Sequence, residues 1–65
     1  MNKSCIRIYF CFLNQNSEVE QDDDGREIYH CNKYLDLSIG TAIKEFHKEF
    51  EEVDNKPEIV DIVIE

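Results

Sequence analysis

The sequence predicts an α+β protein in which one helix covers a three-stranded antiparallel sheet, in the chain order strand, strand, helix, strand. Three observations support this fold class. Two strand-like runs flank the acidic turn Asp22-Asp23-Asp24-Gly25, an apolar stripe with three- and four-residue spacing follows Ser38, and a β-branched run begins after Pro57. A chain of 65 residues is expected to form a single domain, residues 1–65.

The first expected strand, residues 4–13, is the most apolar run of the chain. Its β-branched and aromatic residues favour a strand over a helix. Both faces are largely apolar, since Ile6, Ile8, Phe10 and Phe12 alternate with Cys5, Tyr9, Cys11 and Leu13. Such a pattern is typical of a central strand that is covered on both sides.

The second expected strand leaves the acidic turn at Glu27 and runs to Tyr34, with alternating residues on its two faces. Gly25 readily adopts the positive φ that a hairpin tip requires. The polar run 14–24 before it is long for a hairpin loop, so either the first strand continues through Val19 or the tip is mobile.

The helix is expected over residues 39–53, with Ser38 as its N-cap and Leu37 packed against Ala42. Asn55 is expected to close it, and Pro57 prevents its continuation. One arrangement of the apolar stripe turns Ile39, Phe46 and Val53 inward and leaves Ala42, Ile43 and Phe50 at the rim. Glu45, Glu49 and Glu52 form an acidic ridge beside this stripe.

The last expected strand, residues 58–65, turns Val60, Ile62 and Ile64 inward and Asp61 and Glu65 outward. If the helix crosses back over the sheet, this strand pairs with the first strand, and the strand order is 2-1-3. One helix covers only one face, and chains below about 70 residues rarely build a sufficient core alone. We therefore expect a homodimer.

The formal net charge of −8 disfavours binding to nucleic acid or to an anionic membrane. It fits either simple solubility or attraction to a basic protein surface, including a DNA-binding groove. The sequence shows no signal peptide and no long apolar run, so we expect a cytoplasmic protein with free thiols. Among its cysteines, only Cys11 and Cys31 are candidates for pairing.

No catalytic motif is present, and we expect a binding protein, not an enzyme, without cofactor or metal. His30 and His47 lie apart and are expected at the surface. The run from Glu20 to Gly25 resembles the start of a calcium loop, but its twelfth position is Cys31 instead of glutamate.

The acidic turn and the start of the helix together resemble the small uracil-DNA glycosylase inhibitors encoded by short-tailed Bacillus phages. In that family the same QDDDG is followed by a basic residue, a tyrosine-bearing strand and a short L-x-L-S start of the helix. The matching residues are Gln21-Asp22-Asp23-Asp24-Gly25-Arg26-Glu27-Ile28-Tyr29, then Lys33, Leu35, Leu37 and Ser38. The order of elements and the acidity extend the resemblance to the whole chain.

The resemblance implies a homodimer that inhibits uracil-DNA glycosylase as an acidic DNA mimic in the cytoplasm of the infected bacterial host. In the family, the two helices form a groove for an apolar finger of the enzyme, with carboxylates standing where phosphates would lie. Phe46 and Phe50 reproduce the family's aromatic pair, with His47 in place of its glutamate. The expected partner-binding residues are Ile39, Ala42, Ile43, Glu45, Phe46, Glu49, Phe50 and Glu52.

Other interpretations stay open at this point. The stripe and its glutamates also fit an ordinary core with a solvated face. The same acidic helix would suit an anti-defence or antitoxin-like inhibitor of another basic nucleic-acid-processing protein. A ubiquitin-like interaction module would need a further strand, and a plain structural subunit would bind through its sheet rather than through Glu45 or Glu49.

Overall fold

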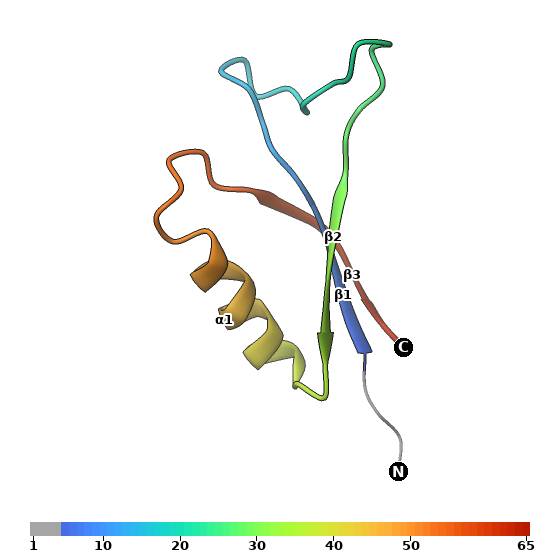
Figure 1. Ribbon diagram of the computed structural model, residues 1–65, viewed down its shortest axis with the longest axis vertical. Helices are drawn as coiled ribbons and strands as arrows, with labels where there is room; N and C mark the ends of the chain where they lie inside the picture. The colour runs from blue at the N-terminus through green and yellow to red at the C-terminus, as the bar shows by residue number, and fades with distance from the viewer. Residues whose placement is uncertain (1–4) are drawn as a thin grey trace.

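The computed structural model describes residues 5–65 and contains the expected order of elements. These are β1 (Cys5–Cys11), β2 (His30–Leu35), α1 (Ile39–Glu49) and β3 (Glu58–Ile64). The three strands form one antiparallel sheet in the order β2-β1-β3, which confirms the predicted order (Figure 1). The expected start of the first strand at Ser4 lies outside the described residues.

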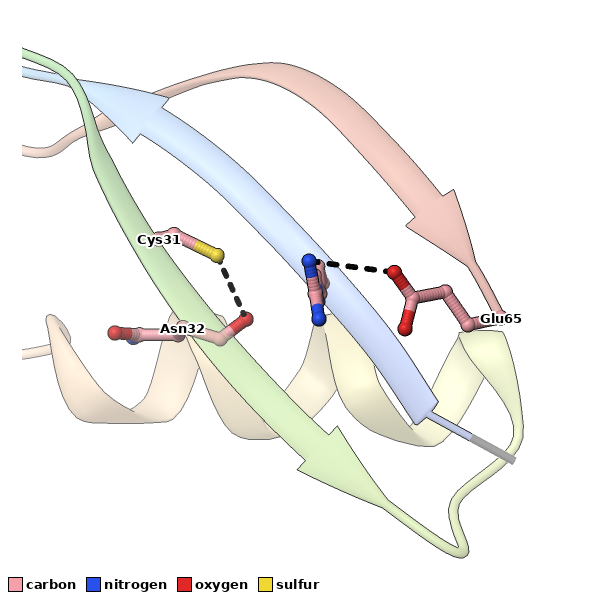
Figure 2. A network of polar contacts seen from close by, with 4 residues as sticks. Cys31, Asn32 and Glu65 are labelled. Carbon is pink, nitrogen blue, oxygen red and sulfur yellow. Dashed lines mark hydrogen bonds and ion pairs between the residues drawn. The ribbon is translucent and has the colours of Figure 1, made fainter. Parts of the chain in front are cut away.

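The core lies between the sheet and α1. Ile8, Ala42 and Phe46 are completely buried, and Ile6, Phe10 and Tyr34 are nearly so. Phe10 contacts Phe46 and Phe50 with ring centroids 5.0 and 5.4 Å apart. Within one chain α1 covers only one face of the sheet, and the expected covering of β1 on its second face stays a prediction. We call the other side the open face; Figure 2 views the sheet from this side, with α1 behind it.

The segment between β1 and β2 forms two consecutive reversals instead of one long hairpin. The chain turns at Asn14–Ser17, where the Asn14 side chain accepts hydrogen bonds from the N–H groups of Asn16 and Glu18. Residues 18–21 then run between the diverging ends of the two strands, with isolated bridges at Leu13–Val19 and Gln21–Glu27 (Figure 1). The first strand therefore does not continue through Val19.

The acidic turn has the expected form. Gly25 adopts a φ of 83°, and its N–H donates to the Asp22 carbonyl at 3.0 Å. The Asp22 carboxylate accepts from the N–H groups of Asp24 and Arg26 at 2.9 and 3.0 Å, a local pairing typical of aspartate in turns. Regular strand β2 begins only at His30, not at Glu27, because residues 26–28 pair with the inserted segment.

The helix begins as predicted and ends earlier. Ser38 is the N-cap, and its hydroxyl accepts from the Thr41 N–H at 3.2 Å. The regular helix ends at Glu49, whereas the apolar spacing predicts a helix that runs to Val53. The Lys56 ammonium, not Asn55, closes this end by donating to the carbonyls of Phe50 and Glu51. Asn55 instead donates to the Leu13 carbonyl at 3.1 Å.

Two predictions of inward residues need correction. Ala42 of α1 is in the core and not at the rim, while Ile39 at the start of α1 and Val53 beyond its end are 44 and 40 % exposed. In β3, an irregularity opposite Tyr9 and Phe10 leaves Val60 outside the pairing register and half exposed, and Ile64 at the strand end is also exposed. Ile59 and Ile62 are the residues of β3 that pack against the core.

Candidate functional site

The acidic ridge of the helix lies above β2. The amide of Asn32, at the middle of this strand, donates to the Glu49 carboxylate at 2.9 Å and to the Tyr34 hydroxyl at 3.4 Å. One helical turn before Glu49, Glu45 is exposed on the same flank of α1. Asn32 therefore holds one carboxylate of the ridge at a defined place, while Glu45 stays free to meet a partner.

Tyr34 lies beneath this ridge, and the carboxylates of the ridge shift the pKa of its phenol. Burial is the main cause that raises the pKa of the Tyr34 phenol; the hydrogen bond with Asn32 lowers this pKa, and Glu49 and then Glu45 raise it. The phenol is therefore neutral at physiological pH and adds no charge of its own. The surface formed by Glu45, Glu49, Asn32 and Tyr34 is called the ridge cluster below.

The structure separates the expected partner-binding residues into three groups. Ala42 and Phe46 are completely buried and cannot touch a partner of the folded chain, which corrects their assignment. Ile39 is 44 % exposed, and Ile43 and Phe50 are half-buried against the core. Glu45, Glu49 and Glu52 are exposed, but Glu52 lies beyond the end of the helix.

The acidic and apolar members of the set lie on opposite flanks of the helix. At 100° per residue, Ala42 and Phe46 point to the sheet, with Glu45 and Glu49 on one side of them and Ile43 and Phe50 on the other. The groove that the resemblance implies lies between the helices of two copies and stays a prediction. The ridge cluster is acidic and polar, with the Tyr34 ring in its floor.

Asn32 and Tyr34 are the ridge residues that sequence reasoning missed. Strand alternation places them on the same side of β2 as His30, and Phe10 stacks on His30 at 5.2 Å, so this side faces the core. A polar Asn in the middle of the core-facing side of a strand was the available signal, because such an amide needs a partner from the covering helix.

The open face carries a second, mixed surface. Arg7 of β1 forms an ion pair with Glu65 at 3.2 Å, shown with Cys31 and Asn32 of β2 in Figure 2. Leu35 on β2 is 62 % exposed. All three thiols, Cys5, Cys11 and Cys31, are free, so the candidate pairing of Cys11 with Cys31 is not formed.

Other kinds of site find little support in the part of the chain that the structure describes. Residues 5–65 contain no group of three His, Cys, Asp or Glu side chains placed to hold a metal ion. The same residues include no helix long and apolar enough to cross a membrane. A shallow hollow of about 290 Å³ lies at the diverging strand ends, lined by Phe12, Leu13, Asn14, Glu20, Gln21 and Asn55.

Fold and site together define a small α+β protein with one acidic helix flank supported by an edge strand. Comparison of the chain with family models, curated proteins and solved structures gives no significant match.

Proposed function

We propose that this chain inhibits uracil-DNA glycosylase by acting as an acidic DNA mimic that blocks the enzyme's DNA-binding cleft. The observation that carries the proposal is the ridge cluster, in which Asn32 fixes the exposed carboxylate of Glu49 beside that of Glu45. A cleft that binds DNA presents cations and hydrogen-bond donors to phosphates, and suitably placed carboxylates are complementary to the same groups.

Two further features support this proposal. The net charge of −8 favours attraction to a basic cleft and disfavours binding to DNA itself. The residues of the family resemblance also have structural roles consistent with it, since Asp22 and Gly25 form the tight turn and Ser38 caps the helix. The inhibitor would need no cofactor and would act in the cytoplasm of an infected bacterial host.

In this proposal the protein works as a homodimer. The chain is thin, with principal extents of 44 × 26 × 13 Å, and α1 leaves one sheet face open. Its radius of gyration is 13.4 Å, against about 11 Å for a compact domain of this length. A second copy would bury part of this excess surface and double the acidic ridge. The contacts with the enzyme are assigned to Glu45 and Glu49 on one flank of α1, to Ile39, Ile43 and Phe50 on its other flank, and to Glu52 beyond its end.

The test is excision of uracil from DNA by purified uracil-DNA glycosylase with the purified chain added. We expect loss of excision near equimolar chain, and half-inhibition by Glu45→Gln/Glu49→Gln at a concentration at least about tenfold higher, because two charge pairs are lost. Glu18→Gln/Glu58→Gln removes the same charge from exposed positions outside the helix and is expected to inhibit like the original chain.

Two results would reject the proposal. One is undiminished excision at a tenfold molar excess of the chain. The other is equal weakening by the two double variants, which would show that net charge alone, and not the ridge cluster, governs inhibition.

A further inference from the structure

The exposed side of α1 carries two parallel rows of opposite charge. Glu45 and Glu49 form the acidic row, which belongs to the ridge cluster. Lys44 and Lys48 form a second row, called the basic row below, and both lysines are exposed. Each lysine follows a completely buried residue of α1 by two positions, so at 100° per residue the basic row points away from the sheet. Each lysine also directly precedes a glutamate, so the two rows lie 100° apart around the helix.

The stability of the helix alone does not explain this separation of charges. Both rows place like charges four positions apart, which destabilises an isolated helix, whereas opposite charges at this spacing stabilise it. Glu49 is also the last residue of the helix, where the negative end of the helix dipole disfavours a carboxylate. The dipole favours a base at Lys48 in the last turn, but it does not account for Lys44 one turn earlier.

The basic row has no acidic partner within residues 5–65. The contacts between acidic and basic side chains in this part of the chain lie elsewhere, on the sheet and on the segment before the acidic turn. Glu45 and Lys48 are three positions apart, a spacing at which helical side chains can meet, yet no ion pair joins them. Lys44 and Lys48 therefore keep both charges available to another molecule.

We propose that the basic row contacts an acidic strip of the glycosylase beside its basic cleft, and that Lys44 and Lys48 thereby select this enzyme among DNA-binding proteins. The inference rests on the proposed function and adds the chemistry of a second strip of the enzyme surface. Carboxylates complement two exposed ammonium groups, just as the cations of the cleft complement the acidic row.

The basic row also disfavours the wrong partners. Two rows 100° apart on a helix about 10–12 Å wide are separated by roughly 8–9 Å, close to the Debye length of about 8 Å at 0.15 M salt. Salt therefore screens the lysines only in part from a cation that binds to the acidic row. A uniformly basic surface is repelled by the lysines, whereas a basic surface with an acidic strip beside it is attracted at both rows.

The first test compares two variants that lose the same charge, in titrations of purified uracil-DNA glycosylase. Lys44→Gln/Lys48→Gln removes the basic row and keeps good helix formers in place. We expect its half-inhibition concentration to rise about fivefold, although this variant is more negative than the original chain. Arg26→Gln/Lys33→Gln removes two exposed cations outside the helix and should inhibit at least as well as the original chain. Circular dichroism checks that both variants are folded.

The outcomes separate the inference from the proposed function. Inhibition by Lys44→Gln/Lys48→Gln that equals or exceeds that of the original chain would overturn the inference and leave the proposed function standing. Absence of inhibition by the original chain would reject the proposed function and, with it, the contact of the basic row with this enzyme.

A second test measures the repulsion without the glycosylase. The probe is polylysine, which is basic throughout and offers no acidic strip. Lys48→Gln and Lys33→Gln each remove one positive charge, the first beside the ridge cluster and the second from the edge strand β2. At 0.15 M salt, the affinity for polylysine should increase at least about twofold more for Lys48→Gln than for Lys33→Gln, because the acidic row loses a neighbouring cation. Equal increases for the two variants would overturn the inference.

Discussion

At the scale of the residue, Cys11 shows that a side chain on the open face can be buried within a single chain. It points away from α1, yet it is only 2 % exposed. Burial raises the pKa of its thiol, and the charges of Glu58 and Glu27 raise it further. Cys31 is exposed on the neighbouring strand.

We expect iodoacetamide at pH 7.5 to alkylate Cys31 first and Cys11 last, because the reactive thiolate of Cys11 is both rare and covered. Mass spectrometry of tryptic peptides over time measures the order. Cys5, which is half-buried, provides the internal comparison. Modification of Cys11 as fast as that of Cys31 would contradict its burial.

Tyr34 predicts a dependence of stability on alkaline pH. Its pKa is raised in the folded chain, mainly by burial, so the folded state holds this proton more tightly than the unfolded state does. The associated stabilisation is complete below about pH 10, which is the pKa of tyrosine in the unfolded chain. It is lost as the pH rises through the higher pKa of Tyr34 in the folded chain. Urea unfolding between pH 8 and 11 should show this loss.

Tyr34→Phe is the matched variant, because it keeps the ring and removes the titrating group. Its free energy of unfolding should fall less between pH 9 and 11 than that of the original chain. The hydrogen bond to Glu27 raises the pKa of the exposed Tyr29 phenol as well, so Tyr29→Phe measures the part of the pH dependence that this second tyrosine contributes. If the free energy of unfolding falls equally with pH for the original chain and for Tyr34→Phe, then Tyr34 does not cause this dependence on pH.

At the scale of the element, the start of α1 is defined by local chemistry. Asp36 adopts a φ of 59°, which aspartate tolerates better than most residues, and it turns the chain out of β2. Ser38 then accepts the Thr41 N–H, and Leu37 packs against the core cluster that contains Ala42. Each of these features is readable within a few residues of sequence.

Ser38→Ala should lower the free energy of unfolding by about 1 kcal/mol, because an N–H of the first turn loses its acceptor. Ser38→Gly should lower the free energy of unfolding by only a few tenths of that value. Ser38→Asp should keep the stability of the original chain. Chemical denaturation of the three variants measures the differences. A loss for Ser38→Gly as large as that for Ser38→Ala would contradict the capping role.

At the scale of the whole molecule, charge acts in opposite directions on the two proposed associations. Two copies that each carry −8 repel one another, whereas a basic enzyme attracts them. Salt screens both effects, since the Debye length falls from about 30 Å at 0.01 M to about 3 Å at 1 M. The proposed dimer and the proposed complex should therefore respond to salt with opposite sign.

We expect sodium chloride at 0.5 M, compared with 0.02 M, to tighten the dimer and weaken binding to the glycosylase. Sedimentation equilibrium measures the first change, and titration of the enzyme measures the second. Glu18→Gln/Glu58→Gln, with less repulsion, should show a smaller response of the dimer. Parallel weakening of both associations by salt would contradict this account.

The sequence by itself determined the elements and their order, because alternation, helical spacing, the Gly25 turn and the Ser38 cap act over short distances. It also determined the central place of β1, whose apolar residues are too many for an edge strand. Only the tertiary structure decided where the glutamates stand relative to the apolar stripe.

The physical reason is that burial depends on distant neighbours. Asn32 binds Glu49 across 17 positions of sequence, Lys56 ends the helix by reaching back to its last turn, and the irregularity at Val60 exists only against β1. Packing against the sheet buries Ala42 and Phe46, and the hydrogen bond from Asn32 holds Glu49 over the edge strand β2.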